Sequence, residues 1–317
     1  MKIGLVQVDG KLPNLALMQI CAYHEARGHQ VEWFKGELYA DEYDEIYASK
    51  IFAFSEMPQL PERAKVGGTG IDHTNNLPCE IAAFAPSYSL YPDCNFHLGF
   101  TMKGCRLSCT FCVVPKKEGR PRLNSTVDDL LLNPNGGDRL MLLDNDFFGG
   151  ENWRANLERI IELDLKVCFV QGLNIRTGFL TDEQAALLSK AHYYNSTFSS
   201  KYLTFAWDIY KQEKMVFDGI DLCERNGIKP SRMQFFVLIG YKSTPEQDLD
   251  RVTKLFERGC DPYAMPYNTF DRYQRAFCRW VNTRIMSKVA WADYSHGDWN
   301  RENRPPTPQI EQARLFV

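Results

Sequence analysis

Short β-rich runs alternate with runs of helical spacing between residues 97 and 267. The β-rich runs cover residues 97–102, 139–144, 166–171, 202–207, 233–240 and 261–267. Helical runs follow four of them, at residues 152–163, 181–190, 210–225 and 244–257. Strands joined by helices pair in parallel with right-handed crossovers, and a curved parallel sheet can close into part of a barrel. The pattern therefore predicts an α/β fold with a partial (βα)6 barrel.

A smaller α/β pattern precedes the barrel pattern. It has strand-like runs at residues 2–8, 30–34 and 45–54 and a helical run at residues 15–26. Strands and helices in this alternation are typical of an open parallel sheet, so we expect a small Rossmann-like α/β domain. The glycine-rich residues 66–70 follow it and favour either a tight turn or a backbone site for a phosphate.

The length of 317 residues is enough for one large domain or two modest ones. The predicted parts are a Rossmann-like domain at residues 1–85, a linker at 86–94, the partial barrel at 95–270, and a basic carboxyl-terminal helix with an extended tail at 271–317. Turn-forming and aromatic residues indicate the linker, and prolines indicate the tail.

Composition narrows the class of protein. A net charge of -3 at pH 7 argues against non-specific binding of nucleic acid by the whole surface. No apolar run reaches membrane-spanning length, and the first residues lack the pattern of a signal peptide, so no membrane association is expected. The ten cysteines then indicate a reducing compartment, and we expect the protein to be cytoplasmic.

Cys105, Cys109 and Cys112 form a C-x-x-x-C-x-x-C motif directly after the first barrel strand. Thiolates usually hold the irons of a 4Fe-4S cluster, and three thiolates leave one iron open to another ligand. A structural zinc site completed by Cys94 or His97 is the alternative, although the chain has no second C-x-x-C pair. A disulfide is not expected, because cysteines this close together cannot brace a large domain.

The motif, with Phe111 directly before its third cysteine, resembles the radical S-adenosylmethionine (radical SAM) superfamily. The phrases QGLNIR, FAWD, DPYAMPYN and RAFCRWVN also resemble radical SAM proteins of gut bacteria and their phages. The resemblance implies that Cys105, Cys109 and Cys112 hold a catalytic 4Fe-4S cluster and that Phe111 lies beside the cofactor. It implies reductive cleavage of S-adenosylmethionine to a 5′-deoxyadenosyl radical, which abstracts hydrogen from a substrate that the sequence does not identify.

Residues after the second barrel strand are candidates for binding the methionine part of S-adenosylmethionine. Gly149, Gly150 and Glu151 resemble the G-G-E element of the superfamily, which presents backbone carbonyls and a carboxylate to the methionine ammonium. Glycines suit this role because backbone oxygens can approach a cation where no side chain intrudes. Asp144 and Asn145 offer alternative acceptors, since the proline that usually follows the glutamate is absent.

Later strand ends supply four more candidates for this cofactor. Arg176 can pair with the methionine carboxylate, or it can bridge barrel helices instead. Asn174 can reach a ribose hydroxyl or the substrate, and Asp208 can accept a hydrogen bond from the ribose. Gly240 ends the fifth strand, where the resemblance implies that adenine lies against the backbone.

Two basic segments are candidates for binding partners. Lys116, Lys117, Arg120 and Arg122 lie beside the cysteines, where they can hold an anionic substrate or a flavodoxin- or ferredoxin-type electron donor, or form a solvated loop. The segment 272–292 has no acidic residue and three arginines on one helical face, Arg272, Arg275 and Arg279. It can bind nucleic acid or a nucleotide, or it can be an amphipathic helix that caps the barrel.

The amino-terminal domain leaves other activities open. It resembles the domain that precedes the barrel in cobalamin-dependent radical SAM proteins and in methylthiotransferases. Cobalamin is not expected, because the chain has no D-x-H-x-x-G motif, and Cys21, Cys79 and Cys94 do not have methylthiotransferase spacing. Two alternatives stay open. One is a methyl- or methylthiotransferase acting on nucleic acid or peptide, which the resemblance of the amino-terminal domain suggests, and the other is a non-catalytic protein that binds zinc and nucleic acid.

Overall fold

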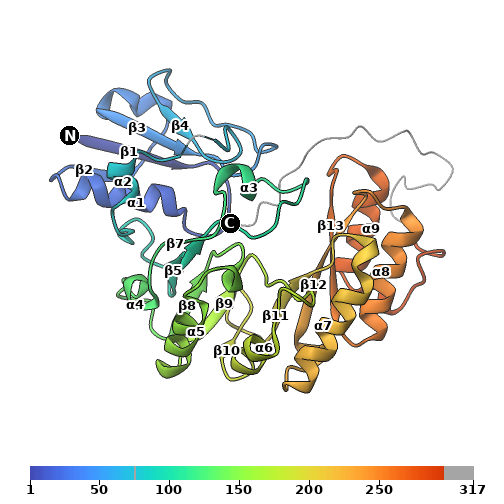
Figure 1. Ribbon diagram of the computed structural model, residues 1–317. Coiled ribbons are helices and arrows are strands. Elements are labelled where there is room, and N and C mark those ends of the chain that lie inside the picture. Colours follow the sequence, from blue (N-terminus) through green and yellow to red (C-terminus); the bar gives the residue numbers. More distant parts are fainter. Residues whose placement is uncertain (75, 296–317) are drawn as a thin grey trace.

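Four strands near the amino end form a parallel sheet in the order β2-β1-β3-β4. The computed structural model describes residues 1–74 and 76–295 and is shown in Figure 1. The elements of this part are β1 (Lys2–Gln7), α1 (Leu15–Glu25), β2 (Gln30–Trp33), β3 (Glu45–Ser49), β4 (Lys65–Gly67) and α2 (Cys79–Ala82). The first two predicted strands, the helix between them and the first half of the third strand are confirmed.

The predicted third strand is wrong beyond Ser49. The backbone N–H groups of Ile51 and Phe52 donate to the Asp9 carboxylate, at 2.7 and 2.9 Å, and so leave the sheet ladder. The chain then crosses the glycine-rich segment. A Cβ on Gly68, whose φ is +101°, would lie 2.2 Å from the carbonyl oxygen of Lys50, so close backbone packing accounts for this glycine.

The six predicted barrel strands are present in the described residues, and those next to each other in the chain pair in parallel, except for β9 and β11. They are β5 (His97–Gly99), β8 (Arg139–Leu142), β9 (Lys166–Phe169), β11 (Leu203–Ala206), β12 (Met233–Ile239) and β13 (Asp261–Pro266). They form two sheets, β10-β9-β8-β5 and β11-β12-β13, in which the unpredicted β10 (His192–Tyr193) pairs with β9. A parallel bridge between Leu173 and Phe205 joins the two sheets.

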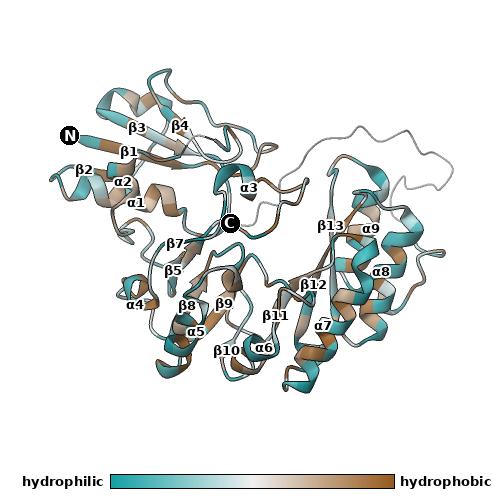
Figure 2. Cartoon of the chain, in the orientation of Figure 1, coloured by the Kyte–Doolittle hydropathy of each residue, from teal (hydrophilic) through white to brown (hydrophobic). Residues whose placement is uncertain are grey.

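Helices cover the outer side of these strands (Figure 1). They are α5 (Trp153–Glu162), α6 (Asp182–Leu188), α7 (Glu213–Arg225) and α8 (Pro245–Glu257). The outward turns of α5, α6 and α8 are hydrophilic in Figure 2, whereas Leu157, Ile220 and Leu255 on the inner faces belong to the main hydrophobic core. Thr244 caps α8, and Pro245 occupies its first turn.

Helix α9 (Arg272–Asn282) packs against β13. Its apolar side is buried, while Arg272, Arg275 and Arg279 are exposed. The Asn282 side chain fixes the contact, because it both accepts from and donates to the backbone of Ala264, at 2.8 and 2.9 Å. The helix is thus amphipathic, and binding of nucleic acid by its arginines stays a prediction. The predicted extended tail lies outside the described residues from residue 296 onward.

The longest helices are α7 and α8. Over residues 1–74 and 76–295, no helix combines the length and the apolar character that a bilayer crossing requires.

Candidate functional site

A short antiparallel pair of strands brackets the cysteine motif. Lys103 in β6 (Met102–Lys103) is paired with Arg122 in β7 (Arg122–Leu123), and the loop between them contains the short helix α3 (Val114–Lys117). Gly104, with φ +88°, begins the loop, and a Cβ there would lie 2.2 Å from the carbonyl oxygen of Arg120. The two ends of the loop therefore meet through backbone contact, which only glycine permits here.

The three cysteines line one cavity together with residues that follow three neighbouring strands. Its polar lining includes Asn145 after β8, Gln171, Asn174 and Arg176 after β9, and Asp208 after β11. These residues lie at the carboxyl ends of parallel strands, which is the edge where α/β barrels gather their chemistry. The prediction placed the three cysteines and four of these five polar residues in one site, and the structure brings them together.

The thiols suit soft metal chemistry. Burial raises the pKa of Cys105 to about 12, because a thiolate loses hydration inside the protein. Iron binding would therefore displace a proton from this thiol. In the described part of the chain, no three His, Cys, Asp or Glu side chains gather around one point as a single ion requires. A 4Fe-4S cluster instead binds each thiolate at a different iron, so its ligands stand apart.

The residues named for the zinc alternative lie elsewhere. The Cys94 thiol donates to the carbonyl oxygen of Phe96, at 3.4 Å. The Nδ1 atom of His97 accepts from the backbone N–H of Asn133 at 3.1 Å, and its Nε2 lies 3.2 Å from the carbonyl oxygen of Gly137. Both side chains hold the start of β5, at the opposite end of the strand from the cysteine loop. They do not complete a site with the three cysteines.

Phe111 is buried beneath the loop. Its ring lies edge-on to Tyr241, with 5.0 Å between the centroids, and it packs in a cluster with Leu238 and Tyr267. The hydroxyl groups of Thr110 and Tyr241 also hydrogen-bond to each other. The loop is thereby anchored to the end of β12, and an apolar wall forms behind the cysteines.

The ion pair between Arg106 and Asp146 is a second anchor, which the sequence analysis missed. The buried Asp146 carboxylate accepts from Arg106 Nε at 2.7 Å and from its Nη2 at 2.8 Å. It also accepts from the Arg106 backbone N–H at 3.0 Å. Such a bidentate pair fixes both distance and orientation. It ties the cysteine loop to the segment after β8.

The predicted G-G-E element does not line the cavity of the cysteines. A Cβ on Gly149 would lie 2.3 Å from the Asp146 carboxylate, so this glycine makes room for the Arg106–Asp146 pair. Gly150 packs against Met102, and Glu151 is exposed. Gly149 and Gly150 therefore pack against Arg106 and Met102, at the start of the cysteine loop.

Asp144 is also absent from the lining of the cavity, because its carboxylate is buried and engaged. It accepts from the backbone N–H groups of Thr101 and Met102, at 2.8 and 3.3 Å, and from the Thr101 hydroxyl. Burial raises its pKa to about 7, because the carboxylate loses hydration. Asp144 therefore holds the chain between β5 and the cysteine loop.

This raised pKa predicts a pH dependence of stability. Between about pH 4 and pH 7 the folded protein binds the Asp144 proton more tightly than the unfolded chain does, so the contribution of Asp144 to stability falls as pH rises. Above about pH 7 the contribution is constant. We expect the difference in unfolding free energy between the wild type and Asp144→Asn to fall across this window, measured by denaturant unfolding. A difference that is constant or rises with pH would contradict the prediction.

Asn174 and Arg176 lie side by side in the cavity. The Asn174 Oδ1 atom accepts from the Arg176 backbone N–H at 3.2 Å and from Arg176 Nε at 3.0 Å. The guanidinium lies 4.9 Å from the ring centroid of Phe179. Asn174 Nδ2 is buried and has no hydrogen-bond partner among the described residues. A buried donor left unpaired is costly, so this amide points to a ligand that accepts from it.

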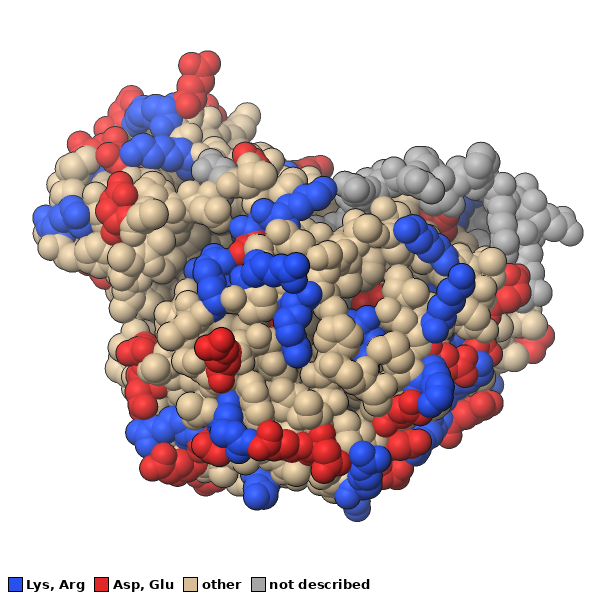
Figure 3. Space-filling view, viewed as in Figure 1, with Lys and Arg blue, Asp and Glu red and all other residues tan. Residues whose placement is uncertain are grey.

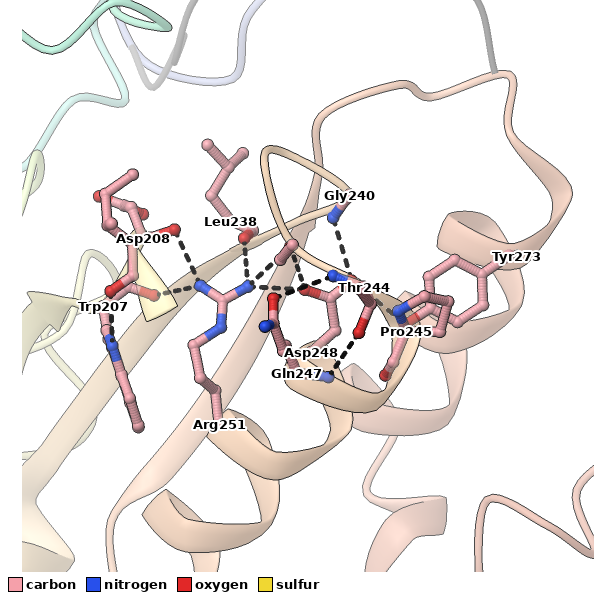
Figure 4. Close-up of polar contacts among 12 residues, drawn as sticks. Trp207, Asp208, Leu238, Gly240, Thr244, Pro245, Gln247, Asp248, Arg251 and Tyr273 are labelled. Carbon is pink, nitrogen blue, oxygen red and sulfur yellow. Dashed lines mark hydrogen bonds and ion pairs between the residues drawn. The ribbon is translucent and has the colours of Figure 1, made fainter. Parts of the chain in front are cut away.

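Asp208 and Gly240 are held by a buried pair that the sequence analysis also missed, Asp248 and Arg251 of α8 (Figure 4). Arg251 donates to the carbonyl oxygens of Asp208 at 2.9 Å and Leu238 at 2.8 Å. The Gly240 N–H donates to Asp248 Oδ2 at 3.0 Å. Gly240 does not line the cavity, although its φ of +74° favours glycine. The pair thus fixes the ends of β11 and β12.

The predicted site residues divide into two groups. Those that line the cavity are Cys105, Cys109, Phe111, Cys112, Asn145, Asn174, Arg176 and Asp208. Those that lie outside it are Asp144, Gly149, Gly150, Glu151 and Gly240. No protein-family model matches the chain, and no curated protein is similar to it in sequence.

Proposed function

We propose that the protein is a radical SAM enzyme. The observation that carries the proposal is that three cysteines of the C-x-x-x-C-x-x-C motif share one cavity with polar residues from three neighbouring strand ends. Thiolates are the ligands that iron–sulfur clusters prefer. The unpartnered Asn174 amide in the same cavity supports a second, polar ligand beside the cluster.

The fold supports the same proposal. Six parallel strands follow one another in chain order, and helices cover one side of them, which fits a partial (βα)6 barrel. The parallel order β2-β1-β3-β4 with α1 beside it fits a Rossmann-like domain. No lower axial histidine for cobalamin is expected there, because the sequence lacks the motif.

Each lining residue has a distinct task in this proposal. Cys105, Cys109 and Cys112 would hold the 4Fe-4S cluster, and Arg176 would pair with the carboxylate of S-adenosylmethionine. When bound and reduced, the cluster supplies the electron that cleaves S-adenosylmethionine to a 5′-deoxyadenosyl radical for hydrogen abstraction. Asn174 Nδ2 would donate to an oxygen of the nucleoside or amino acid. The apolar wall around Phe111 excludes water from this side of the site.

The electron would come from an acidic donor protein. Lys116 and Arg120 are exposed on the cysteine loop, close in the chain to the cluster ligands. A flavodoxin- or ferredoxin-type protein presents the complementary charge.

Anaerobic reconstitution with iron and sulfide tests the proposed function. We expect about four irons per chain, an electron paramagnetic resonance signal after reduction, and formation of 5′-deoxyadenosine from S-adenosylmethionine. Bound cobalt or a second cluster would favour methyl or methylthio transfer instead. A colourless protein that contains zinc and forms no 5′-deoxyadenosine would overturn the proposal and favour a non-catalytic protein.

Asn174→Ala is expected to weaken binding of S-adenosylmethionine about tenfold, since a buried hydrogen bond of this kind is worth roughly 1 to 2 kcal/mol. Equilibrium dialysis of the reconstituted protein measures the affinity. Asn226→Ala is the matched control, because the Asn226 amide is paired with Leu222 and Asp182 on the outer helix side. Equal affinity of the Asn174 variant and the wild type would show that the amide does not contact the ligand.

A further inference from the structure

A larger cavity lies between the amino-terminal sheet and the carboxyl ends of β5, β8 and β9. It measures about 1000 Å³, and α1, β3, β4 and α2 line one side of it. Phe100, Leu143 and Gln171, which follow β5, β8 and β9, line the other side. A cavity of this size can enclose a small organic molecule.

The larger cavity adjoins the cavity of the cysteines. Val114, Asn145 and Gln171 contribute to the walls of both. Asn145 and Gln171 follow two neighbouring parallel strands, so the border lies at the reactive edge of the sheet. A molecule in the larger cavity would therefore be next to whatever binds at the cysteines.

The wall near the cysteine loop has more positive than negative charge. Lys103, Lys117 and Arg122 line it, with Glu118 as the neighbouring carboxylate. Lys103 and Arg122 are directly opposite each other in the β6–β7 pair, so their side chains lie on one face. Glu118 is already engaged, because its Oε2 accepts from the Gly104 N–H at 2.8 Å. In Figure 3 lysines and arginines gather over the region of α3 and β7.

The two lysines in this wall have neutral groups as partners. Lys117 Nζ donates to the neutral hydroxyl of Thr69, at 2.7 Å. Lys103 Nζ lies 5.3 Å from the centroid of the Phe100 ring, and no ion pair joins it to a carboxylate in the part of the chain that the structure describes. Burial costs an ammonium group its hydration and lowers the pKa of Lys117, while the nearby Glu118 carboxylate acts in the opposite direction. A bound anion would offset this cost for both groups.

We propose that the larger cavity is the substrate pocket and that it takes a small substrate whose phosphate or carboxylate group binds to Lys103 and Lys117. The identity of the pocket as a substrate site rests on the proposed function. Binding of the anion itself needs neither the cluster nor S-adenosylmethionine. The Thr69 loop, which projects from the amino-terminal sheet, then has a direct role in the site, because it positions Lys117.

Calorimetric titration of the full-length protein with inorganic phosphate and, separately, with succinate tests the proposal. We expect one of the two to bind in a one-to-one ratio. Lys103→Met and Lys117→Met should each weaken that binding about tenfold or more, because a charged hydrogen-bond donor is lost while the apolar stem is kept. Phosphate binding alone would indicate a phosphorylated substrate, and succinate binding alone a carboxylate.

Lys190→Met is the control, because Lys190 is exposed just after α6 and lines neither cavity. Its affinity should stay within about twofold of the wild type, since surface charges contribute little. The proposal is overturned if neither anion binds to the wild type, or if the Lys103 and Lys117 variants bind as well as the control. Anion binding by a protein that never forms a cluster would remove the proposed function but leave the anion site.

Discussion

Cys109→Ala is expected to remove the iron–sulfur cluster and to lower the formation of 5′-deoxyadenosine more than about 100-fold. Losing a residue that only orients a metal ligand already costs roughly 10- to 100-fold, so losing a ligand should cost more. The fold should persist, because the loop is held by Arg106 with Asp146 and by Phe111 against Tyr241. Iron analysis and electron paramagnetic resonance of the anaerobically reconstituted variant measure the effect.

Cys79→Ala is the control for this experiment. Cys79 is exposed in α2, outside the cysteine loop, so its replacement should leave the iron content unchanged. Full iron content and an unchanged resonance signal in Cys109→Ala would mean that this thiol is not a ligand. The assignment of the motif to a three-cysteine cluster would then be wrong.

The long strands could be predicted because buried strands consist largely of consecutive apolar residues. The strand β12 (Met233–Ile239) is almost wholly buried, and its residues from Phe235 to Ile239 form a continuous apolar run. Such runs are typical of parallel strands that are covered on both faces. The helices between the strands were equally clear, since their apolar residues recur at helical spacing, and a threonine caps the start of both α6 and α8.

The two-residue strands could not be predicted in this way. The pairs β6 with β7 and β9 with β10 depend on which segments meet in space, and two residues carry no periodicity. The end of β3 could not be predicted for the same reason. The Asp9 carboxylate accepts a hydrogen bond from the backbone N–H of Ile51, which is 42 residues away in the chain. Long-range hydrogen bonds of this kind leave no local signal.

Within the candidate site, the sequence predicted which residues follow strands, but it could not predict which of them line the cavity. Cys105, Asn174 and Arg176 line the cavity as expected, because each follows a strand at the carboxyl edge of a parallel sheet. Gly149 and Asp144 also follow a strand, yet they pack beneath the cysteine loop. The cysteine loop and the residues just before it cover both positions, and the sequence of the segment after β8 contains no sign of that contact.

The buried pair in α8 did have a signal in the sequence. Asp248, Arg251, Val252 and Leu255 share one helical face, and all four are buried. Two charged residues on an otherwise apolar face indicate a buried ion pair or a functional site. The spacing from Asp248 to Arg251 also matches an i, i+3 pair.

Arg251→Met is expected to destabilise the fold by about 3–5 kcal/mol, because removing one partner leaves the other charge buried. The Arg251 and Asp248 side chains are fully buried and lie 2.7 Å apart. The substitution also leaves the carbonyl oxygens of Trp207 and Leu238 without the donor that now lies 2.8 Å from each. Chemical unfolding of the purified variant measures the loss.

Arg258→Met is the control for this prediction, because it removes an ion pair near the surface at the end of the same helix. Arg258 follows the last turn of α8 and binds Asp221 and Glu224 near solvent, so its loss should cost at most about 1 kcal/mol. The double variant Arg251→Met with Asp248→Leu should recover part of the stability, since no lone charge stays buried. If Arg251→Met costs no more than Arg258→Met, the pair does not hold the strand ends. If it costs the larger amount, binding of S-adenosylmethionine should weaken as well, because the same guanidinium fixes the backbone of Asp208 in the cavity wall.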